Sequence, residues 1–304
     1  MTDNTVTLTD DLVQPFMIET SGLSGRLVRL GTTVDTILNR HDIVEPVKVL
    51  LGKVLALGAG LATALKYDGI FTIQIKGDGP VSLIVADVTS AGDVRGYAQV
   101  SGELPPDEEA LDAPVEKLLG KGYLAFTVDQ GPEMERYQGI VELKGKNLED
   151  SIDYYFEQSE QFASKAHLAA GKTPEGQWRA TCIILQRLPE EGGSGKARLD
   201  GDEDWTRACT FMKSATDQEM LDSRLSANDL LFRLFHEDGV RVFDPKPLDV
   251  GCRCSREKIS TVLTKLPDED LEHALEDGKV SVTCEFCNIT FDFDREQIDE
   301  LRQS

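Results

Sequence analysis

Four of the six cysteines lie within 36 residues near the end of the sequence. They form two pairs, Cys252-Arg253-Cys254 and Cys284-Glu285-Phe286-Cys287, with 29 residues between them. In each pair the sulfurs are close enough along the chain to share one metal ion, and two pairs complete the tetrahedral geometry of structural zinc sites. We therefore predict that Cys252, Cys254, Cys284 and Cys287 bind one Zn²⁺. Because protein fills all four positions, catalytic zinc is not expected.

The predicted zinc module, residues 246–304, is small and should depend on its metal. A segment of about 60 residues buries little apolar surface, and a structural zinc can supply on the order of 10–16 kcal/mol of apparent binding free energy. Zinc holds the sulfurs as thiolates, which are the form that oxidants attack. A disulfide within one pair would remove two ligands, and the remaining two should not retain the metal. If the module unfolds, any segment docked on it loses support.

The composition excludes some classes of function. The chain has 304 residues, 40% of them hydrophobic, which suits a large domain plus smaller ones. A formal net charge of −22 repels phosphate backbones, so we expect no nucleic-acid partner. The N-terminus has no basic start, and the most apolar stretch, residues 54–65, is too short for a membrane span. We expect a cytoplasmic protein without membrane contact, whose clustered cysteines serve metal or redox chemistry.

Residues 1–188 are predicted to form an α+β body. Short apolar runs separated by Gly-, Pro- and Ser-containing turns favour antiparallel sheets packed on buried helices. The apolar run 46–66 is predicted to be a buried helix with Pro46 in its first turn. The pattern over 178–188 fits either a strand or a helix. The other expected elements are strands at 26–30, 70–75, 81–88, 94–100, 123–128 and 137–143 and helices at 33–40 and 148–163, the last capped by Asn147.

Residues 189–245 are predicted to be a helical linker. A Gly-, Ser- and Glu-rich stretch at 189–195 marks the domain boundary before it. Apolar residues from Trp205 to Ala215 recur at helical spacing, and a second helix is expected near Ser226. Because 20 of the 56 residues at 190–245 are charged, these amphipathic helices can form little core of their own. They should be ordered only by docking, and the pattern leaves open whether that docking is permanent or metastable.

Histidines and aromatic residues outside the cysteine motifs have simpler interpretations. His236 and His273 are expected at the surface, because four cysteines complete the metal site without them. The aromatic run at 154–156 is expected to pack along its own helix rather than bind a partner.

No recognisable pattern of catalytic residues accompanies the cysteines. Glu157 and Glu160 lie three residues apart without a nucleophile or metal motif, so we expect solvated carboxylates rather than an acid–base pair. Gly58 and Gly60 lie inside a predicted helix and lack the rest of a dinucleotide-binding motif. The sequence also has no P-loop motif, and we expect no enzymatic activity.

With these features, the sequence resembles the bacterial 33 kDa chaperonin family, the redox-regulated heat-shock holdases. The resemblance covers nearly all 304 residues. It rests on both cysteine motifs and on four further segments, which are Phe243-Asp244-Pro245, Val250-Gly251, Tyr155-Phe156-Glu157-Gln158-Ser159-Glu160-Gln161, and Asp68-Gly69-Ile70-Phe71-Thr72 leading into Gly77-Asp78-Gly79-Pro80-Val81-Ser82.

The resemblance implies a switch between two states. The reduced, zinc-bound protein would be inactive. Oxidation by hypochlorite, or by peroxide with mild unfolding, would pair Cys252 with Cys254 and Cys284 with Cys287, release zinc and unfold the linker. Exposed apolar surface would then bind unfolding client proteins without ATP, and the active form would tend to be a homodimer. The charge of −22 would keep a client complex soluble.

Two other classes of function stay open. One is a zinc-ribbon module that binds proteins without chaperone activity. Residues 246–304 carry 8 Lys+Arg and 14 Asp+Glu, a net charge of −6, which argues against nucleic acid there but not against protein. The other is a zinc-supported enzyme, for which no nucleophile–base motif is present. Cys182 and Cys209 lie outside the metal motif, and we expect each to be a packed residue without a special role.

Overall fold

The computed structural model describes residues 10–65, 67–131, 134–159, 163–187, 200–275 and 278–303. The chain forms two compact units, residues 1–250 and residues 251–304. The boundary expected at 189–195 lies outside the described residues. The helical segment that follows it belongs to the larger unit, while the four motif cysteines belong to the smaller one.

The first sheet of the larger unit, which we call sheet A, has the strand order β10-β1-β2-β9-β8, and β11 also pairs with β1. All its pairings are antiparallel. Strand β9 is buried along its whole length, because elements cover both of its faces. The strands are β1 (Leu12–Ile18), β2 (Leu23–Leu30), β8 (Ser164–Lys172), β9 (Trp178–Gln186), β10 (Val240–Val242) and β11 (Lys246–Pro247).

The second sheet, sheet B, has the order β12-β5-β4-β3-β6-β7. Its pairings are antiparallel, except that β12 lies parallel to β5. The antiparallel sheets expected from the sequence are thereby confirmed. The strands are β3 (Ile70–Gly77), β4 (Val81–Thr89), β5 (Asp93–Val100), β6 (Gly122–Asp129), β7 (Tyr137–Glu142) and β12 (Asp249–Val250).

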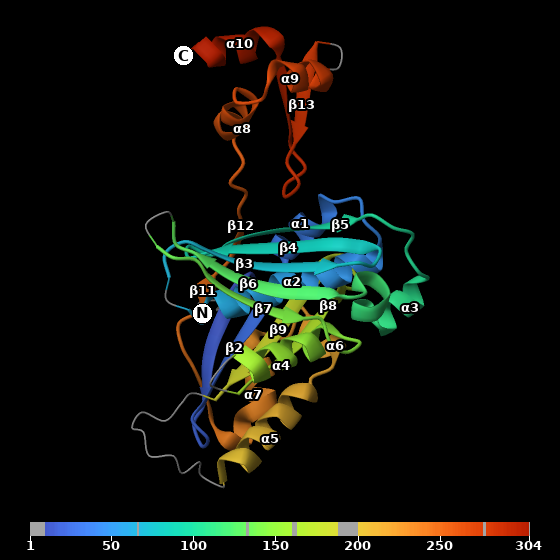
Figure 1. The fold of residues 1–304 in the computed structure, drawn as a ribbon. Coiled ribbons are helices and arrows are strands. Elements are labelled where there is room, and N and C mark those ends of the chain that lie inside the picture. Colours follow the sequence, from blue (N-terminus) through green and yellow to red (C-terminus); the bar gives the residue numbers. More distant parts are fainter. Residues whose placement is uncertain are drawn as a thin grey trace. The chain divides into compact units, whose positions relative to one another are not determined.

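Helix α2 (Glu45–Ala62) lies between the two sheets and is buried along most of its length (Figure 1). Pro46 occupies its first turn, as expected, where the missing N–H costs nothing. Gly60 explains how closely the helix approaches sheet A: a Cβ at this position would lie 2.6 Å from Ile184 Cδ1. Gly58 faces sheet B, near Ile73 and Val88. These glycines therefore serve helix packing.

Smaller elements complete the core around α2. Tyr155 and Phe156 of α4 are buried in it, and the Asn147 backbone N–H donates to the Asp150 carboxylate at the start of that helix, 3.1 Å away. These elements are α1 (Thr32–Asn39), α3 (Asp107–Asp112), a π-helical turn η1 (Val115–Leu119) and α4 (Leu148–Ser159).

Three linker helices cover the face of sheet A opposite α2. They are α5 (Asp200–Lys213), α6 (Asp217–Leu221) and α7 (Ala227–Phe235), followed by a short 3-10 turn η2 (His236–Asp238). Ser226 caps α7 and accepts a hydrogen bond from the Asp229 N–H at 3.1 Å, as the sequence predicts. Phe235 stacks on Phe16 of β1 with ring centroids 5.6 Å apart.

Some elements differ from the sequence-based expectation. Residues 178–186 form a strand, which the pattern had left undecided, and β8 was not expected at all. Helix α4 ends at Ser159, and residues 160–162 of the predicted helix lie outside the described residues. Residues 246–250, expected in the C-terminal module, pair with both sheets of the larger unit through β11 and β12.

The smaller unit is a hairpin with three short helices. Strands β13 and β14 pair antiparallel, and Val280 lies opposite Phe293. Among the residues described in this unit, the buried apolar cluster consists of Leu263, Leu271, Val280, Phe293 and Ile298. The elements are α8 (Arg256–Leu263), α9 (Asp268–Ala274), β13 (Lys279–Thr283), β14 (Thr290–Asp294) and α10 (Arg295–Gln303).

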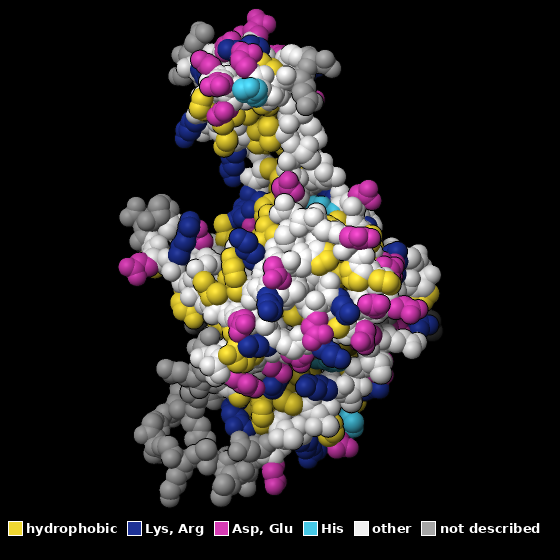
Figure 2. Space-filling model, turned by 45° about the vertical axis from the view of Figure 1, so that its right-hand side comes forward, with side chains coloured by type: hydrophobic (Ala, Val, Ile, Leu, Met, Phe, Trp, Pro, Cys, Tyr) yellow, Lys and Arg dark blue, Asp and Glu magenta, His cyan; other side chains and the backbone are white. Residues whose placement is uncertain are grey.

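No helix in the described part of the chain is both long and apolar enough to cross a membrane. Figure 2 shows acidic and basic side chains interspersed over the visible face of the larger unit, with apolar side chains between them.

Candidate metal and redox centre

The first cysteine pair lies in the segment between β12 and α8. Cys252 and Cys254 follow the last strand of the larger unit within four residues and directly precede the cap of α8. That cap is Ser255, whose hydroxyl accepts a hydrogen bond from the Lys258 N–H at 3.2 Å. The Lys258 ammonium also donates to the Arg253 carbonyl at 2.9 Å. These hydrogen bonds fix the chain where the first cysteine pair runs into α8.

The second pair occupies the turn of the β13–β14 hairpin. The Asn288 N–H donates to the Cys284 carbonyl at 2.8 Å, and the Cys284 N–H donates to the Ile289 carbonyl at 3.0 Å. Asn288 has a φ of 58°, in the left-handed region that asparagine tolerates better than most residues. This tight turn directs both sulfurs, from Cys284 and Cys287, toward one point.

The four sulfurs predicted to bind metal come together: all lie within 4.8 Å of one another. The Sγ–Sγ distances are 3.3 Å for Cys252–Cys254, 3.7 Å for Cys252–Cys284 and 3.4 Å for Cys254–Cys287. A tetrahedron with zinc–sulfur bonds of about 2.3 Å has sulfur–sulfur edges of about 3.8 Å. The donor set and its spacing therefore fit a tetrahedral metal ion after small shifts of the sulfurs.

Charge repulsion within the cluster supports the same conclusion. Burial raises the pKa of Cys254 and of Cys287. Burial also opposes ionisation of Cys252, but hydrogen bonds from the Cys254 backbone N–H and the neighbouring sulfurs outweigh it and lower that pKa to about 7. Cys252 is thereby the first to ionise relative to Cys254 and Cys287, as expected when like charges are this close. A divalent cation would remove the repulsion and allow all four sulfurs to ionise.

The two histidines considered as spare ligands are exposed. His273 lies on α9, and His236 follows α7, where its Nδ1 lies 3.1 Å from the Phe232 carbonyl. Among the described residues, the metal-ligating group contains only the four cysteines. The expectation that both histidines are surface residues is confirmed.

Glu157 is exposed and pairs with Lys165, whose Nζ lies 3.6 Å from its carboxylate. Glu160 lies outside the described residues.

The two cysteines outside the motif are packed, as expected. Cys182 is fully buried in β9 on the α2 side of sheet A, and burial raises its pKa well above the usual range. Cys209 on α5 is half-buried against the apolar cluster between sheet A and the linker helices, and burial raises its pKa to about 11. Both thiols are therefore protonated and poorly reactive at neutral pH.

A set of polar side chains on sheet A contacts the linker, although no sequence pattern pointed to them. Arg29, His167 and Thr181 come from three different strands and each lies against a main-chain carbonyl of residues 215–225. No short motif joins them, because 138 residues separate Arg29 from His167 along the chain. Only the strand register places them together.

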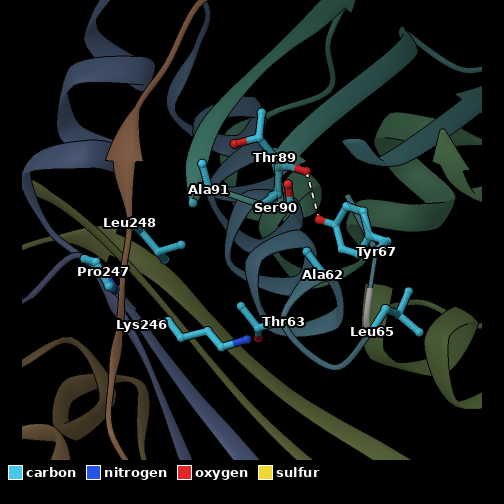
Figure 3. A pocket seen from close by; sticks show the side chains of 12 residues that line it. Ala62, Thr63, Leu65, Tyr67, Thr89, Ser90, Ala91, Lys246, Pro247 and Leu248 are labelled. Atoms are coloured by element: carbon cyan, nitrogen blue, oxygen red, sulfur yellow. Dashed lines mark hydrogen bonds between the residues drawn. The ribbon is translucent and has the colours of Figure 1, made fainter. Parts of the chain in front are cut away.

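A cavity of about 460 Å³ lies at the C-terminal end of α2 (Figure 3). Tyr67 donates to the Val88 carbonyl at 3.1 Å, and burial raises its pKa to about 12, so the phenol is no base at neutral pH. The Lys246 side chain extends toward Thr63 in Figure 3. The lining belongs to the larger unit and includes none of the motif cysteines.

The fold and the four-cysteine centre define a member of the Hsp33 family. The family model described as "Hsp33 protein" matches residues 11–294, and the chain belongs to this family. Relatives carry the name 33 kDa chaperonin. The Caulobacter vibrioides protein is 40% identical over 291 residues, covering 94% of this chain and 95% of its own. The Escherichia coli K12 protein is 33% identical over 295 residues, covering 97% and 96%.

A solved structure shows the same fold. The crystal structure of the 33 kDa chaperonin from Thermotoga maritima matches with a TM-score of 0.81 and 26% identity. The match covers 97% of this chain and 98% of that chain.

Proposed function

We propose that this protein is a redox-regulated, ATP-independent holdase, a chaperone that binds unfolding client proteins after oxidation. The observation that carries the proposal is a four-thiol cluster in a unit whose described residues form only a small apolar core. Family membership supports it, because relatives with nearly full-length matches are named chaperonins. The protein would act in the cytoplasm, where thiols are kept reduced until stress arises.

In the reduced state, Cys252, Cys254, Cys284 and Cys287 would hold Zn²⁺ as thiolates. Bound zinc would supply the positive charge that four adjacent sulfurs need and would tie the α8 side of the module to its hairpin. The reduced module is therefore folded because of its metal.

Oxidation would remove the ligands in pairs. Two thiolates and one hypochlorous acid give one disulfide, one chloride and one hydroxide: the sulfurs lose two electrons and the chlorine gains them. We propose the pairs Cys252–Cys254 and Cys284–Cys287, following the family resemblance. The distances leave this open, because Cys254 is about as close to Cys287 as to Cys252. Mapping the disulfides by mass spectrometry tests the assignment.

The chain between the linker helices and the smaller unit is held by very short strands. Two residues of β12 pair with β5, two of β11 with β1 and three of β10 with β1. The smaller unit begins at Gly251, directly after β12, so its unfolding removes the order on one side of these strands. Loss of β10 in turn removes the neighbour of α7, and the linker helices are then free to leave sheet A.

Departure of the linker would uncover an apolar surface suited to unfolded protein. The side chains below it form what we call the linker face of sheet A, namely Phe16, Ile18, Leu23, Leu27, Ala169, Ile183 and Leu185. The helices themselves would expose apolar residues such as Met212, Leu231 and Phe235. Such a patch binds apolar segments and also favours association of two copies, so the oxidised form would tend to be a homodimer.

Light scattering of a heat-denatured client tests the proposal, with zinc release followed by a chromogenic chelator. We expect no suppression of aggregation by the reduced protein, and suppression together with zinc release after hypochlorite. Cys209→Ser, which leaves the cluster intact, is the matched control and should behave as the parent. Zinc release without suppression would contradict the holdase function, and equal suppression by the reduced protein would contradict the switch.

A further inference from the structure

The linker face is not purely apolar, because three hydrogen-bond donors lie among its apolar side chains. In the antiparallel register, Arg29 of β2 is directly opposite Thr181 of β9, and His167 of β8 is opposite Ile183. Side chains in such pairs point to the same side of a sheet. The donors therefore share the face with Leu27, Ile183 and their apolar neighbours.

All three donors contact the main chain of the linker rather than its side chains. Arg29 donates to the Asp222 carbonyl at 2.7 Å and to the Leu225 carbonyl. Thr181 donates to the Met220 carbonyl at 2.7 Å, and His167 Nε2 lies 2.9 Å from the Ala215 carbonyl. Any residue type at these positions would offer the same acceptor.

The carbonyls involved lie where a helix leaves them available. Met220 and Asp222 are at the end of α6, Ala215 follows the end of α5, and Leu225 precedes the cap of α7. The last carbonyls of a helix have no intrahelical partner and accept hydrogen bonds from other groups. An unfolded polypeptide has the same property along much of its length, because its main-chain groups are not paired in helices or sheets.

Because the donors lie in a covered surface, any segment that covers the linker face must also accept their hydrogen bonds. The Arg29 side chain is only 1% exposed and is paired on its other side with Asp10, Nε to Oδ1 at 3.2 Å. Burying a charged or polar group is costly unless it is hydrogen-bonded. Apolar side chains alone could cover the face only by leaving these donors unsatisfied, so a suitable occupant must bring carbonyls as well.

Building on the proposed holdase function, we propose that Arg29, His167 and Thr181 bind the main-chain carbonyls of unfolded clients. The linker occupies this site in the reduced protein as an internal substitute for a client. After its release, a client segment places apolar side chains on the linker face and its carbonyls against the three donors. This arrangement recognises an unfolded chain without regard to its sequence.

Thr181→Val tests the proposal, because valine keeps the size of threonine and removes only the hydroxyl. Thr181→Ser is the matched control that keeps the hydroxyl. The probe is a fluorescently labelled, reduced and carboxymethylated α-lactalbumin, which stays unfolded, and its Kd is measured with fully oxidised protein. Loss of one hydrogen bond should weaken binding by Thr181→Val roughly two- to tenfold, while Thr181→Ser stays near the parent. In the reduced protein, Thr181→Val should also raise hydrogen exchange at 215–225.

Four outcomes are distinguishable. Equal Kd values for oxidised parent and Thr181→Val would overturn the proposal, even if exchange at 215–225 rises, because the donor would then serve the linker alone. Equal weakening by Thr181→Ser would also overturn it, since the hydroxyl would not be responsible. If Thr181→Val does not fold, His167→Leu provides the same comparison. Failure of the oxidised parent to bind the probe would instead contradict the proposed function itself.

Discussion

The two faces of sheet A are covered in different ways. On one face, α2 packs against Val28, Ala180 and Ile184, and the contact is so close that a Cβ at position 60 would displace the Ile184 side chain. On the other face, three short helices cover an apolar surface that contains a buried arginine, a threonine and a histidine. The first face is an ordinary core. The second combines apolar burial with donors that bind main chain. This combination is expected of a surface that binds one polypeptide segment and then another.

The difference shows how one sheet can serve both stability and binding. Strand β9 sends Cys182 and Ile184 to the α2 face and Thr181 and Ile183 to the linker face. The sheet therefore keeps one complete core when its other face is uncovered. Perturbations of the molecule should therefore affect the two faces separately.

Removal of the metal should have the largest effect. Cys284→Ser, or a strong chelator on the parent, should unfold residues 251–304, because structural zinc supplies on the order of 10–16 kcal/mol of apparent folding free energy. Hydrogen exchange should then rise in the module and in the linker helices, while strand β9 and helix α2 stay protected. Unchanged exchange across 200–238 would show that the linker does not depend on the module. Cys209→Ser should retain zinc and serves as the control.

Matched leucine truncations separate the two faces directly. Leu168 of β8 is buried on the α2 face and Leu231 of α7 on the linker side. Each Leu→Ala change should cost about 2–5 kcal/mol. Leu168→Ala should lower the Tm of the whole larger unit, whereas Leu231→Ala should mainly raise hydrogen exchange in 200–238 and lower the oxidant dose for activation. The same loss of Tm from both variants would mean that the linker is part of one cooperative core.

The alkylation rates of the two packed cysteines, Cys209 and Cys182, report separately on the two faces of sheet A. At pH 8 the raised pKa of Cys209, about 11, keeps its thiolate fraction low, so labelling should be roughly a hundredfold slower than for an ordinary exposed cysteine. Between pH 8 and pH 9 the rate should rise about tenfold, because the thiolate fraction rises tenfold per pH unit below the pKa. Cys182 should label only on global unfolding.

Oxidation of the protein should change the alkylation rate of Cys209 but not that of Cys182. Release of the linker should bring Cys209 close to the rate of an exposed thiol and leave Cys182 protected, as quantified by peptide mass spectrometry. Fast labelling of Cys182 in oxidised protein would show that the α2 face opens too, and the comparison would fail.

Removal of two helix caps should have the smallest effects. Ser226→Ala removes the cap of α7 and Ser255→Ala that of α8, each at a cost of about 1 kcal/mol. Ser226→Ala should lower the oxidant dose for activation with zinc affinity unchanged. Ser255→Ala should instead weaken zinc binding several-fold in a chelator competition. If Ser226→Ala instead weakened zinc binding and Ser255→Ala instead lowered the oxidant dose, the assigned roles of linker and module would be contradicted.

Much of this arrangement could be predicted from local sequence. Cysteine spacing predicted which four sulfurs come together, because each pair lies in one turn or loop. Residues 178–186 remained ambiguous because a strand buried on both faces has no alternation of polar and apolar residues. Strand β8 was missed because its SKAHLAAGK sequence is rich in alanine, which is uncommon in strands.

Other features could not be predicted from local pattern. Strands β10 to β12 have two or three residues each, too few for any periodicity. Arg29, His167 and Thr181 appear in the sequence as unrelated polar residues, because only the register of three strands brings them together. Long-range pairing of this kind has no local signal.

Recognition through carbonyls has a consequence for how the linker can change over generations. The loop from Asp222 to Leu225 accepts the hydrogen bonds of Arg29 through main-chain oxygens, and the Arg224 side chain is largely exposed. Mutations that replace these side chains leave the acceptors in place, whereas an insertion or deletion moves them. Selection should therefore preserve the length of this loop more strictly than its residue types.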